Sequence, residues 1–401
     1  MINPLRGMKD TVGEFSEKYI YFIENASRIA KNYGFSYIET PILEETALFK
    51  RSVGESSDIV GKEMYQFTDK GNNDVCMRPE GTAGVVRAFI SQKYDRAGGV
   101  KRFFYHGPMF RYERPQKGRL RQFHQFGVET FGVQSVKEDA MIILMLRDMF
   151  EFFSIKYSLQ INSLGCPDCM PTYRENLVKF LDSIDGLCED CLRRKITNPI
   201  RVLDCKNENC HKLLESAPML LSNICSTCRA DFDELKSILK SFGLEYEVNT
   251  KLVRGLDYYN KTAFEFISNE IGAQSAITGG GRYDKLVEYL DGRSTPGVGF
   301  AMGIERLIDL VKMPENKKIG YYIGAMSDEA IKQVMHLVVK LRKSNVVHTQ
   351  YSSKSLKAHM KAADKVNAKK FICIGDSELE TKTYVVKDLD TKEEISVELR
   401  D

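Results

Sequence analysis

Hydrophobic positions in the first 165 residues follow both helical and strand periods, without a regular alternation of the two. Between residues 16 and 33 apolar side chains recur at helical spacing and stop at Gly34, which predicts a helix. Four strands are expected, at residues 35–40, 73–77, 101–105 and 122–131. The sequence Ser135-Val-Lys-Glu138 matches a capping box and predicts a helix over residues 140–153. This mixture predicts an α+β unit with an antiparallel sheet over residues 1–165.

The pattern changes twice further along the chain. Residues 166–242 are turn-rich and contain most of the cysteines, which indicates an insertion, with a helix expected near residues 173–181. Residues 243–315 resume the first domain, with strands expected at 244–248 and 262–267 and a helix at 303–311. Residues 316–401 alternate regularly, with strands expected at 319–325, 346–351, 370–375 and 384–387 and helices at 328–344 and 354–367. This alternation predicts a small α/β domain whose sheet is partly parallel.

Composition places the chain among ordinary globular proteins. Its 401 residues are 43% hydrophobic and 28% charged, which excludes a disordered or fibrous protein. No apolar run approaches the ~20 residues of a membrane-spanning helix, and the first residues lack the hydrophobic region of a signal peptide. We therefore expect a cytoplasmic protein without membrane contact. With 58 basic against 55 acidic side chains, nucleic-acid contacts would have to come from local patches.

Eight of the ten cysteines fall between residues 166 and 228. They form four close pairs: Cys166 and Cys169, Cys188 and Cys191, Cys205 and Cys210, Cys225 and Cys228. In a chain without a signal peptide, such spacing favours thiolate zinc ligands over disulfides. Eight thiolates suit two structural four-cysteine sites. A single four-cysteine site and reduced, buried thiols remain as alternatives.

The densest candidate chemistry lies in residues 110–121. Five cations surround Glu113 there, namely Arg111, Arg114, Lys117, Arg119 and Arg121. Pro115 and Gly118 predict a loop between two strand-like arms, and arginines on such a hairpin can clamp a polyphosphate by paired hydrogen bonds. The alternative from composition alone is a solvated basic hairpin.

Five motifs resemble those of one enzyme family. Phe110-Arg-Tyr-Glu-Arg114 with residues 119–125 resembles motif 2 of class II aminoacyl-tRNA synthetases, residues 297–306 resemble motif 3, and residues 34–41 resemble motif 1. The stretches Arg254-Gly-Leu-Asp-Tyr-Tyr-Asn260 and Gly279-Gly-Gly-Arg-Tyr-Asp284 resemble signatures of the histidyl-tRNA synthetase family. On these motifs the chain is identified as a member of that family, bacterial type. The resemblance implies a class II catalytic domain, the cysteine-rich insertion and a C-terminal anticodon-binding domain.

The resemblance also implies the activity and an ATP site built from arginines. The activity would be that of an aminoacyl-tRNA ligase that joins histidine to tRNA(His), using ATP with Mg²⁺ and releasing AMP and pyrophosphate. The implied ATP contacts are Arg111 for the α-phosphate, Arg119, Arg121 and Arg306 for the β- and γ-phosphates, and Glu113 and Phe123 for adenine. Arg254 would hold the histidine carboxylate and the α-phosphate together. Arginine suits the negative charge that develops as the carboxylate attacks phosphorus.

Histidine recognition requires partners for an ammonium group and for two ring nitrogens, one a donor and one an acceptor. By resemblance Glu80, Thr82 and Gln125 would bind the ammonium, Glu129 and Tyr259 the ring nitrogens, and Tyr258 would line the site. Without the motifs, Glu129 could equally be an exposed strand carboxylate.

A basic stripe in the last domain could contact tRNA phosphates. Lys354, Lys357, Lys361, Lys365 and Lys369 recur three or four residues apart near the helix expected at 354–367. A solvated helix face explains them equally well.

The resemblance further implies a homodimer. Two other functions are alternatives: an inert paralogue that regulates ATP phosphoribosyltransferase, and a zinc protein that binds nucleic acid without catalysis.

Overall fold

The computed structural model describes residues 2–54, 57–205, 207–253, 256, 258–271, 276–315 and 317–399. It divides into two compact units, residues 1–312 and 313–401. In this described part of the chain no helix combines the length and the apolar character that a transmembrane span requires.

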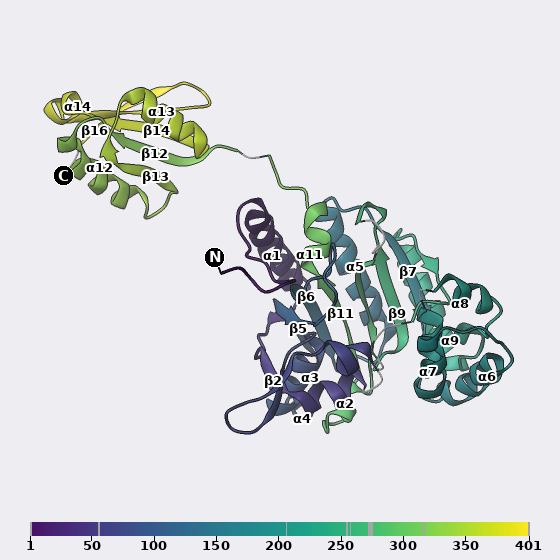
Figure 1. Cartoon of the computed structure of the whole chain (residues 1–401). Coiled ribbons are helices and arrows are strands. Elements are labelled where there is room, and N and C mark those ends of the chain that lie inside the picture. Colours follow the sequence, from purple (N-terminus) through teal and green to yellow (C-terminus); the bar gives the residue numbers. More distant parts are fainter. Residues whose placement is uncertain are drawn as a thin grey trace. The chain divides into compact units, whose positions relative to one another are not determined.

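The first unit is built on a mostly antiparallel sheet, which confirms the predicted fold class (Figure 1). Among the described residues eight strands form it, in the order β1 (Ser36–Tyr37), β5 (Lys101–Phe110), β6 (Gln122–Phe131), β11 (Gly297–Gly303), β10 (Ala276–Arg282), β9 (Asn260–Ile267), β7 (Ser158–Ser163) and β8 (Glu247–Val248). Among the described strands of this sheet, only the edge pairs β1–β5 and β7–β8 are parallel. The long β5–β6 hairpin carries the basic loop of residues 111–121 at its tip.

Helices cover the two faces of this sheet. On one face α1 (Glu14–Asn32), α5 (Val136–Phe152) and α9 (Ser226–Ser241) pack against side chains such as Phe104 and Val128. On the other face α3 (Thr82–Ser91) packs against Tyr105 and Phe131. Because neighbouring residues of a strand point to opposite faces, Phe104 and Tyr105 enter different cores. The same alternation sends Gln125 and Glu129 of β6 to the face of α3.

Smaller elements complete this α3 face. A three-stranded sheet of described residues has the order β2 (Leu43–Glu45), β4 (Asp74–Met77) and β3 (Gln66–Thr68). The short helices on this face are α2 (Thr46–Val53), α4 (Tyr94–Ala97) and α10 (Leu286–Tyr289). The short helix α11 (Ile304–Leu307) packs instead in the core of α1 and α5. Buried side chains of α2, α3 and β4 share a small core, which holds α3 beside the sheet.

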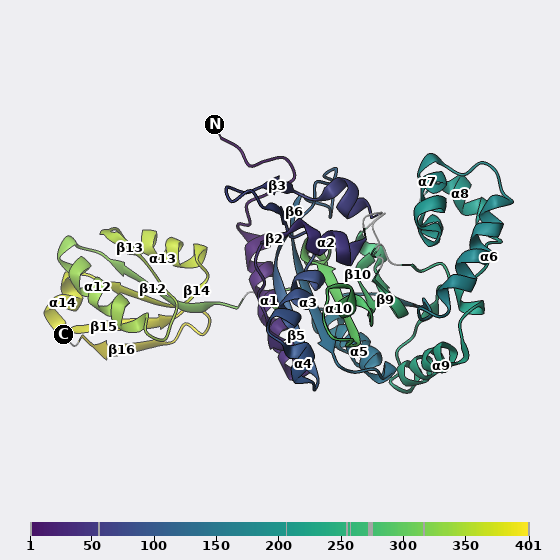
Figure 2. The same cartoon turned by 90° about the horizontal axis from the view of Figure 1, so that it is seen from below.

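The cysteine-rich segment leaves the sheet after β7 and returns through α9 to β8, the neighbour of β7. Its labelled helices lie together on one side of the sheet (Figure 2). Its helices are α6 (Met170–Asp182), α7 (Glu189–Thr197) and α8 (Glu208–Leu213), with a 3₁₀ helix at Pro199–Asp204. A separate hydrophobic core of residues such as Tyr173, Leu177 and Val202 holds them together. The predicted helix near 173–181 is thus present, while α9 was not predicted.

The second unit is the predicted α/β domain. Its described strands form one sheet in the order β13 (Val347–Ser353), β12 (Ile319–Ala325), β14 (Ala368–Ile374), β15 (Thr383–Asp388) and β16 (Glu394–Glu398). The pairs of β12 with β13 and β14 are parallel, and the other two are antiparallel. Helices α12 (Asp328–Leu341) and α14 (Asp376–Thr381) pack in one core, and α13 (Leu356–Lys365) packs in another. The partly parallel sheet is confirmed.

The predicted capping box is only half correct. The Ser135 hydroxyl does accept a hydrogen bond at the start of α5, from the backbone of Lys137 at 3.3 Å. The Glu138 carboxylate does not return to the cap, because Arg102 donates two hydrogen bonds of 2.7 Å to it. A guanidinium that binds both carboxylate oxygens outcompetes a single backbone N–H. The helix begins at Val136, four residues earlier than predicted.

Candidate active site

A buried carboxylate lies at the centre of the α3 face. Glu129 is 1% exposed and accepts hydrogen bonds from the hydroxyls of Thr82 at 2.7 Å and Tyr105 at 3.3 Å. The Tyr283 hydroxyl donates to its second oxygen. The opposing residue of β11 is Gly299, where a Cβ would lie 2.0 Å from that oxygen, so glycine is required there. These residues form what we call the carboxylate pocket.

Burial raises the pKa of Glu129 to about 8, although the hydroxyls of Tyr283 and Thr82 stabilise the ionised form. The described hydrogen-bond partners of this carboxylate are neutral hydroxyls. An arrangement of this kind favours a ligand that brings an N–H donor to Glu129 and replaces the lost solvation.

Side chains of Glu80 and Gln125 accept hydrogen bonds from the backbone at the start of α3, and the bond to Gln125 joins this segment to β6. The Glu80 carboxylate accepts from the backbone N–H groups of Thr82 at 2.7 Å and Ala83 at 2.9 Å, and thereby caps α3. The Gln125 side chain accepts from the backbone of Gly81 at 3.2 Å. Burial raises the pKa of Glu80, and these N–H groups lower it. The structure therefore brings Glu80, Thr82, Gln125 and Glu129 together.

Two tyrosines close the carboxylate pocket on its far side. The Tyr258 ring lies 4.7 Å from the Tyr259 ring and 5.7 Å from the Tyr283 ring, centre to centre. Tyr258 is 3% exposed, and its hydroxyl has no hydrogen-bond partner among the described residues. Burial raises the pKa of Tyr258, so the hydroxyl stays protonated and can donate to a ligand. Arg254, the predicted ligand of the histidine carboxylate, lies outside the described residues.

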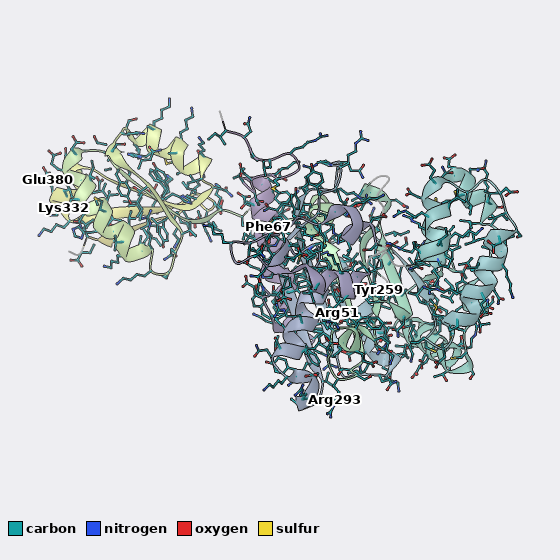
Figure 3. The ribbon with its side chains drawn as sticks, turned by 60° about the horizontal axis from the view of Figure 1, so that its bottom comes forward. Arg51, Phe67, Tyr259, Arg293, Lys332 and Glu380 are labelled. Carbon is teal, nitrogen blue, oxygen red and sulfur yellow. The ribbon has the colours of Figure 1, made fainter. Side chains whose placement is uncertain are left out.

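Tyr259 links this pocket to the cysteine-rich segment. It packs against both the core of that segment and the α3 face, and it is one of the side chains labelled in Figure 3. It also lines a cavity together with Met170 and Asn198.

Next to the carboxylate pocket lies an open cavity with a basic wall, which we call the arginine pocket. Arg111, Arg119 and Arg306 line it, and Gln125 connects it to the carboxylate pocket. Glu113 and Phe123 also line it, and the Arg111 guanidinium lies 5.2 Å from the centre of the Phe123 ring.

The three guanidinium groups destabilise one another. Burial lowers the pKa of Arg306, and the charges of Arg119 and Arg111 lower it further. Glu113 offsets part of this repulsion through ion pairs with Arg119 at 3.5 Å and Arg111 at 3.8 Å. The guanidinium groups of Arg111, Arg119 and Arg306 offer paired N–H donors on one wall of the pocket, an arrangement that suits a polyphosphate.

Arg121 differs from the other predicted phosphate ligands because it does not line the arginine pocket. Its guanidinium lies 3.7 Å from the centre of the Tyr112 ring, and its Nε donates to the backbone oxygen of Glu113 at 3.2 Å. In this structure it supports the hairpin loop rather than the pocket wall.

The comparisons with known proteins agree with this geometry. The family model described as "Histidyl-tRNA synthetase" matches residues 7–307, about three quarters of the chain. The chain belongs to the histidyl-tRNA synthetase family. A second model, described as "Anticodon binding domain", matches residues 313–401.

Individual members of the family are similar over their whole length. A histidine–tRNA ligase from Sulfurimonas denitrificans is 63% identical, with 99% of both chains covered. One from Campylobacter jejuni is 59% identical and covers 100% of this chain and 99% of its own. The crystal structure of the apo histidyl-tRNA synthetase of S. aureus is 35% identical, with a TM-score of 0.83 over 100% of this chain and 98% of that one.

Three contributors to the site were not predicted as site residues. Tyr283 lies within the quoted family signature 279–284, so the motif could have revealed it. Tyr105 follows from strand alternation once β5 is placed against β6. Glu305 lines the arginine pocket and binds His124 through Nδ1 at 2.8 Å and through the backbone. It lies one residue before Arg306, within motif 3.

The structure sorts the eight cysteines of the insertion into two clusters that could hold a metal ion. The outer cluster comprises Cys166, Cys169, Cys225 and Cys228, and the inner cluster comprises Cys188, Cys191, Cys205 and Cys210. All eight are free thiols. A second, larger cavity is lined by Cys188 and Cys205 together with Arg111, Arg119 and Arg306, so the inner cluster borders the arginine pocket.

The predicted lysine stripe is shorter than expected. Helix α13 begins at Leu356, capped by Ser355, so Lys354 precedes it, and Lys369 belongs to β14. Lys357, Lys361 and Lys365 remain as an exposed stripe, opposite the buried His359 and Ala363. Lys354 is also exposed and donates to Gln350 at 2.7 Å.

Proposed function

We propose that this protein is a histidine–tRNA ligase, which activates histidine with ATP and transfers it to the 3′ end of tRNA(His). The observation that carries this proposal is the contact between two complementary pockets. The carboxylate pocket offers a buried acceptor for a ring N–H, and the arginine pocket offers cations for a polyphosphate, with Gln125 at their junction. A ligand in one pocket therefore lies beside a ligand in the other.

In the activation step the histidine carboxylate attacks the α-phosphorus of ATP, and pyrophosphate leaves. This displacement needs no protein nucleophile, because positioning and charge stabilisation supply the catalysis. We assign Arg111 to the α-phosphate and Arg119 and Arg306 to the β- and γ-phosphates. Glu113 and Phe123 would contact adenine. Arg121 would position the loop through Glu113 rather than touch the phosphates.

Mg²⁺ belongs to this proposal as the partner of ATP. The carboxylates of Glu113, Glu265 and Glu305 line the arginine pocket and are oxygen ligands of the kind that Mg²⁺ prefers. When bound, the ion would neutralise charge on the phosphate oxygens. Arg254 would hold the histidine carboxylate next to the α-phosphate, as the family motif implies.

Histidine recognition would use both ring nitrogens of the neutral imidazole. Glu129 accepts from one ring N–H, and Tyr259 faces the other nitrogen, with Tyr258 against the ring. Glu80, Thr82 and Gln125 bind the ammonium group. A buried hydrogen-bonding site rejects analogues that leave its polar groups unpaired, by roughly 10⁴–10⁵-fold in the best cases.

The remaining partners follow from family membership. The second unit would read the anticodon of tRNA(His), and the protein would act as a cytoplasmic homodimer. Zinc in the cysteine-rich segment would be a structural component. The inert regulatory paralogue is disfavoured because both pockets retain their polar side chains and the anticodon-binding unit is present.

Histidine-dependent exchange of labelled pyrophosphate into ATP tests the proposal. We expect exchange with histidine and none above background with the other standard amino acids, followed by charging of tRNA(His) transcripts. Histidine binding by calorimetry without any exchange would contradict the ligase function and support the regulatory alternative. Exchange without charging would contradict the second step alone.

The lysines of α13 give a further prediction. Replacing Lys357 and Lys361 with alanine should weaken tRNA binding and lower the slope of log K against log salt by about 1 for each phosphate that is no longer neutralised. Pyrophosphate exchange, which needs no tRNA, should be unchanged. The matched control is Lys332→Ala on α12, which should leave the slope as in the wild type. An unchanged slope in the double variant would show that this face is only solvated.

A further inference from the structure

The cysteine-rich segment contains a side-chain arrangement that the proposed ligase chemistry does not use. We infer that residues 166–228 bind two zinc ions in a nested arrangement, the outer cluster holding one ion and the inner cluster the other. The first and last cysteine pairs of the sequence then share one ion, and the two middle pairs share the second.

The sulfur positions carry this inference. In the outer cluster the Sγ atom of Cys166 lies 3.6 Å from that of Cys169 and 4.0 Å from that of Cys225. The Cys169 and Cys228 sulfurs are 3.9 Å apart. Four thiolates at the usual Zn–S distance of about 2.3 Å, at the corners of a tetrahedron, lie about 3.8 Å from one another. The clusters already have the spacing of a zinc site.

The inner cluster has the same spacing, with 3.7 Å between the sulfurs of Cys188 and Cys205. In each cluster all four sulfurs lie within 4.8 Å of one another. A disulfide would require about 2.05 Å between two sulfurs, so these cysteines are not paired covalently. The spacing leaves room for one ion per cluster and not for a cluster of several irons.

Backbone N–H groups point at the sulfurs in both clusters. In the outer cluster the backbone N–H of Cys225 donates to the Cys169 sulfur at 3.1 Å, and that of Cys228 donates to the Cys225 sulfur at 3.5 Å. In the inner cluster the backbone N–H of Cys188 donates to the Cys210 sulfur at 3.3 Å, and that of Asn207 donates to the Cys205 sulfur at 3.4 Å. Hydrogen bonds of this kind stabilise thiolates and orient metal ligands. Two such bonds in each cluster are a second observation, independent of the sulfur spacing, that these thiols serve as ligands.

The segment also requires the stabilisation that a bound metal ion would provide. Two of its helices are short, with six residues in α8 and nine in α7. Short helices around a small core obtain little stability from packing alone. The outer ion would join Cys166, just after β7, to the first turn of α9, and so would close the insertion at its base. The inner ion would join α7 to α8.

The inner ion has a consequence for catalysis, which rests on the proposed ligase function. Cys188 precedes α7, and α7 carries Arg194, which pairs with Asp58 at 3.2 Å. Cys188 and Cys205 line the larger cavity beside Arg119 and Arg306. The inner ion would therefore fix the wall of the ATP site, whereas none of the outer cysteines lines that cavity in the described part of the chain.

Metal analysis of the full-length protein, purified under reducing conditions, tests the inference. We expect two equivalents of zinc per chain. Cys166→Ser with Cys225→Ser should remove one equivalent, and Cys188→Ser with Cys205→Ser should remove the other. The crossed pair, Cys166→Ser with Cys188→Ser, should remove both. Pairing of neighbours in sequence would give the opposite result: the crossed pair would lose one equivalent and the Cys166 and Cys225 pair would lose both.

Two further measurements keep the test decisive if a variant folds poorly. Cobalt substitution of the wild-type protein should give thiolate-to-metal charge-transfer bands that saturate at two equivalents. Cys373→Ser, outside the segment, is the matched control and should retain both ions. Fewer than two equivalents in the wild type, or iron in place of zinc, would overturn the inference.

The two double variants also separate this inference from the ligase function. Loss of the inner ion should raise KM for ATP several-fold in pyrophosphate exchange, and loss of the outer ion should leave KM near the wild-type value. If the wild type shows no exchange but binds two zinc ions, the ligase proposal fails and the metal inference stands. Equal effects of the two variants on KM would contradict the role of the inner ion at the ATP site.

Discussion

Replacing Arg306 with alanine should lower kcat for histidine-dependent pyrophosphate exchange by about 10²–10³-fold, the usual effect of removing one fixed donor to transition-state charge. Arg306 is held at the wall of the arginine pocket by its own hydrogen bond to the backbone oxygen of Gly118 at 3.2 Å. It needs no movement to meet a phosphate. Arg306→Lys should recover only part of the rate, because lysine keeps the charge and loses the paired donors.

The Arg306→Ala variant should remain folded. Burial lowers the pKa of Arg306, and the charges of Arg119 and Arg111 lower it further, so its charge costs the folded state stability that alanine would restore. We therefore expect a melting temperature within a few degrees of the wild type, or higher. A large fall in melting temperature would show that Arg306 supports the fold instead.

Arg121→Ala is the matched control for Arg306. It removes an arginine of the same loop whose guanidinium lies on the Tyr112 ring, outside the arginine pocket. We expect a loss of less than about tenfold in kcat, since no fixed donor to the phosphates is removed. Equal losses in both variants would show that Arg121 turns into the pocket when ATP binds, as the family motif implies.

Much of the fold could be predicted because local patterns and tertiary structure agree. The α5 helix, the β5–β6 hairpin and the alternating second unit all have apolar periods that match their burial. The central strands β10 and β11 were missed because glycine has low strand propensity and gives no period. At position 299 the reason for glycine is tertiary: the Glu129 carboxylate occupies the space of a side chain.

The residues of the candidate site also divide into those that local motifs predict and those that depend on tertiary structure. The family motifs allowed Thr82, Gln125 and Glu129 to be predicted as site residues, because each lies at a fixed position in a family signature. The hydroxyl of Tyr105 could not be foreseen, since only the register of β5 against β6 brings it to Glu129. The cysteine spacing predicted the four pairs, but it could not predict that the first and last pairs share one cluster and the two middle pairs share the other. That nesting depends on how α6, α7 and α8 fold back between β7 and α9.

Glu129→Gln should raise the free energy of unfolding at alkaline pH while it weakens histidine recognition. The folded pKa of Glu129 is about 8, against a usual value of 4.5, because the carboxylate is buried. The folded protein therefore holds this proton more tightly than the unfolded chain does. Stability falls as pH rises from 4.5 through 8, and the loss is complete above pH 8.

Glutamine carries no charge and does not incur this loss. Between pH 6 and pH 8 the stability advantage of Glu129→Gln over the wild type should grow by about 2 kcal/mol, at 1.36 kcal/mol per pKa unit. Urea unfolding at the two pH values measures it. Thr82→Ser keeps the hydroxyl that Glu129 accepts from, so as a control it should keep the pH dependence of the wild type. An advantage that does not change with pH would show that Glu129 is already ionised in the folded protein at pH 6.

The effect of Glu129→Gln on function should have the opposite sign. A bound imidazole would donate its ring N–H to Glu129 and so stabilise the ionised carboxylate, and glutamine removes that charged acceptor. Hydrogen bonds to charged groups contribute about 1.5–3 kcal/mol, or roughly 10–150-fold in affinity. KM for histidine in pyrophosphate exchange should rise by that factor, while KM for ATP stays near the wild-type value. A variant that is both more stable and less able to select histidine would identify Glu129 as a residue retained for recognition at the expense of stability. Equal changes in both KM values would instead place its role in the shape of the whole site.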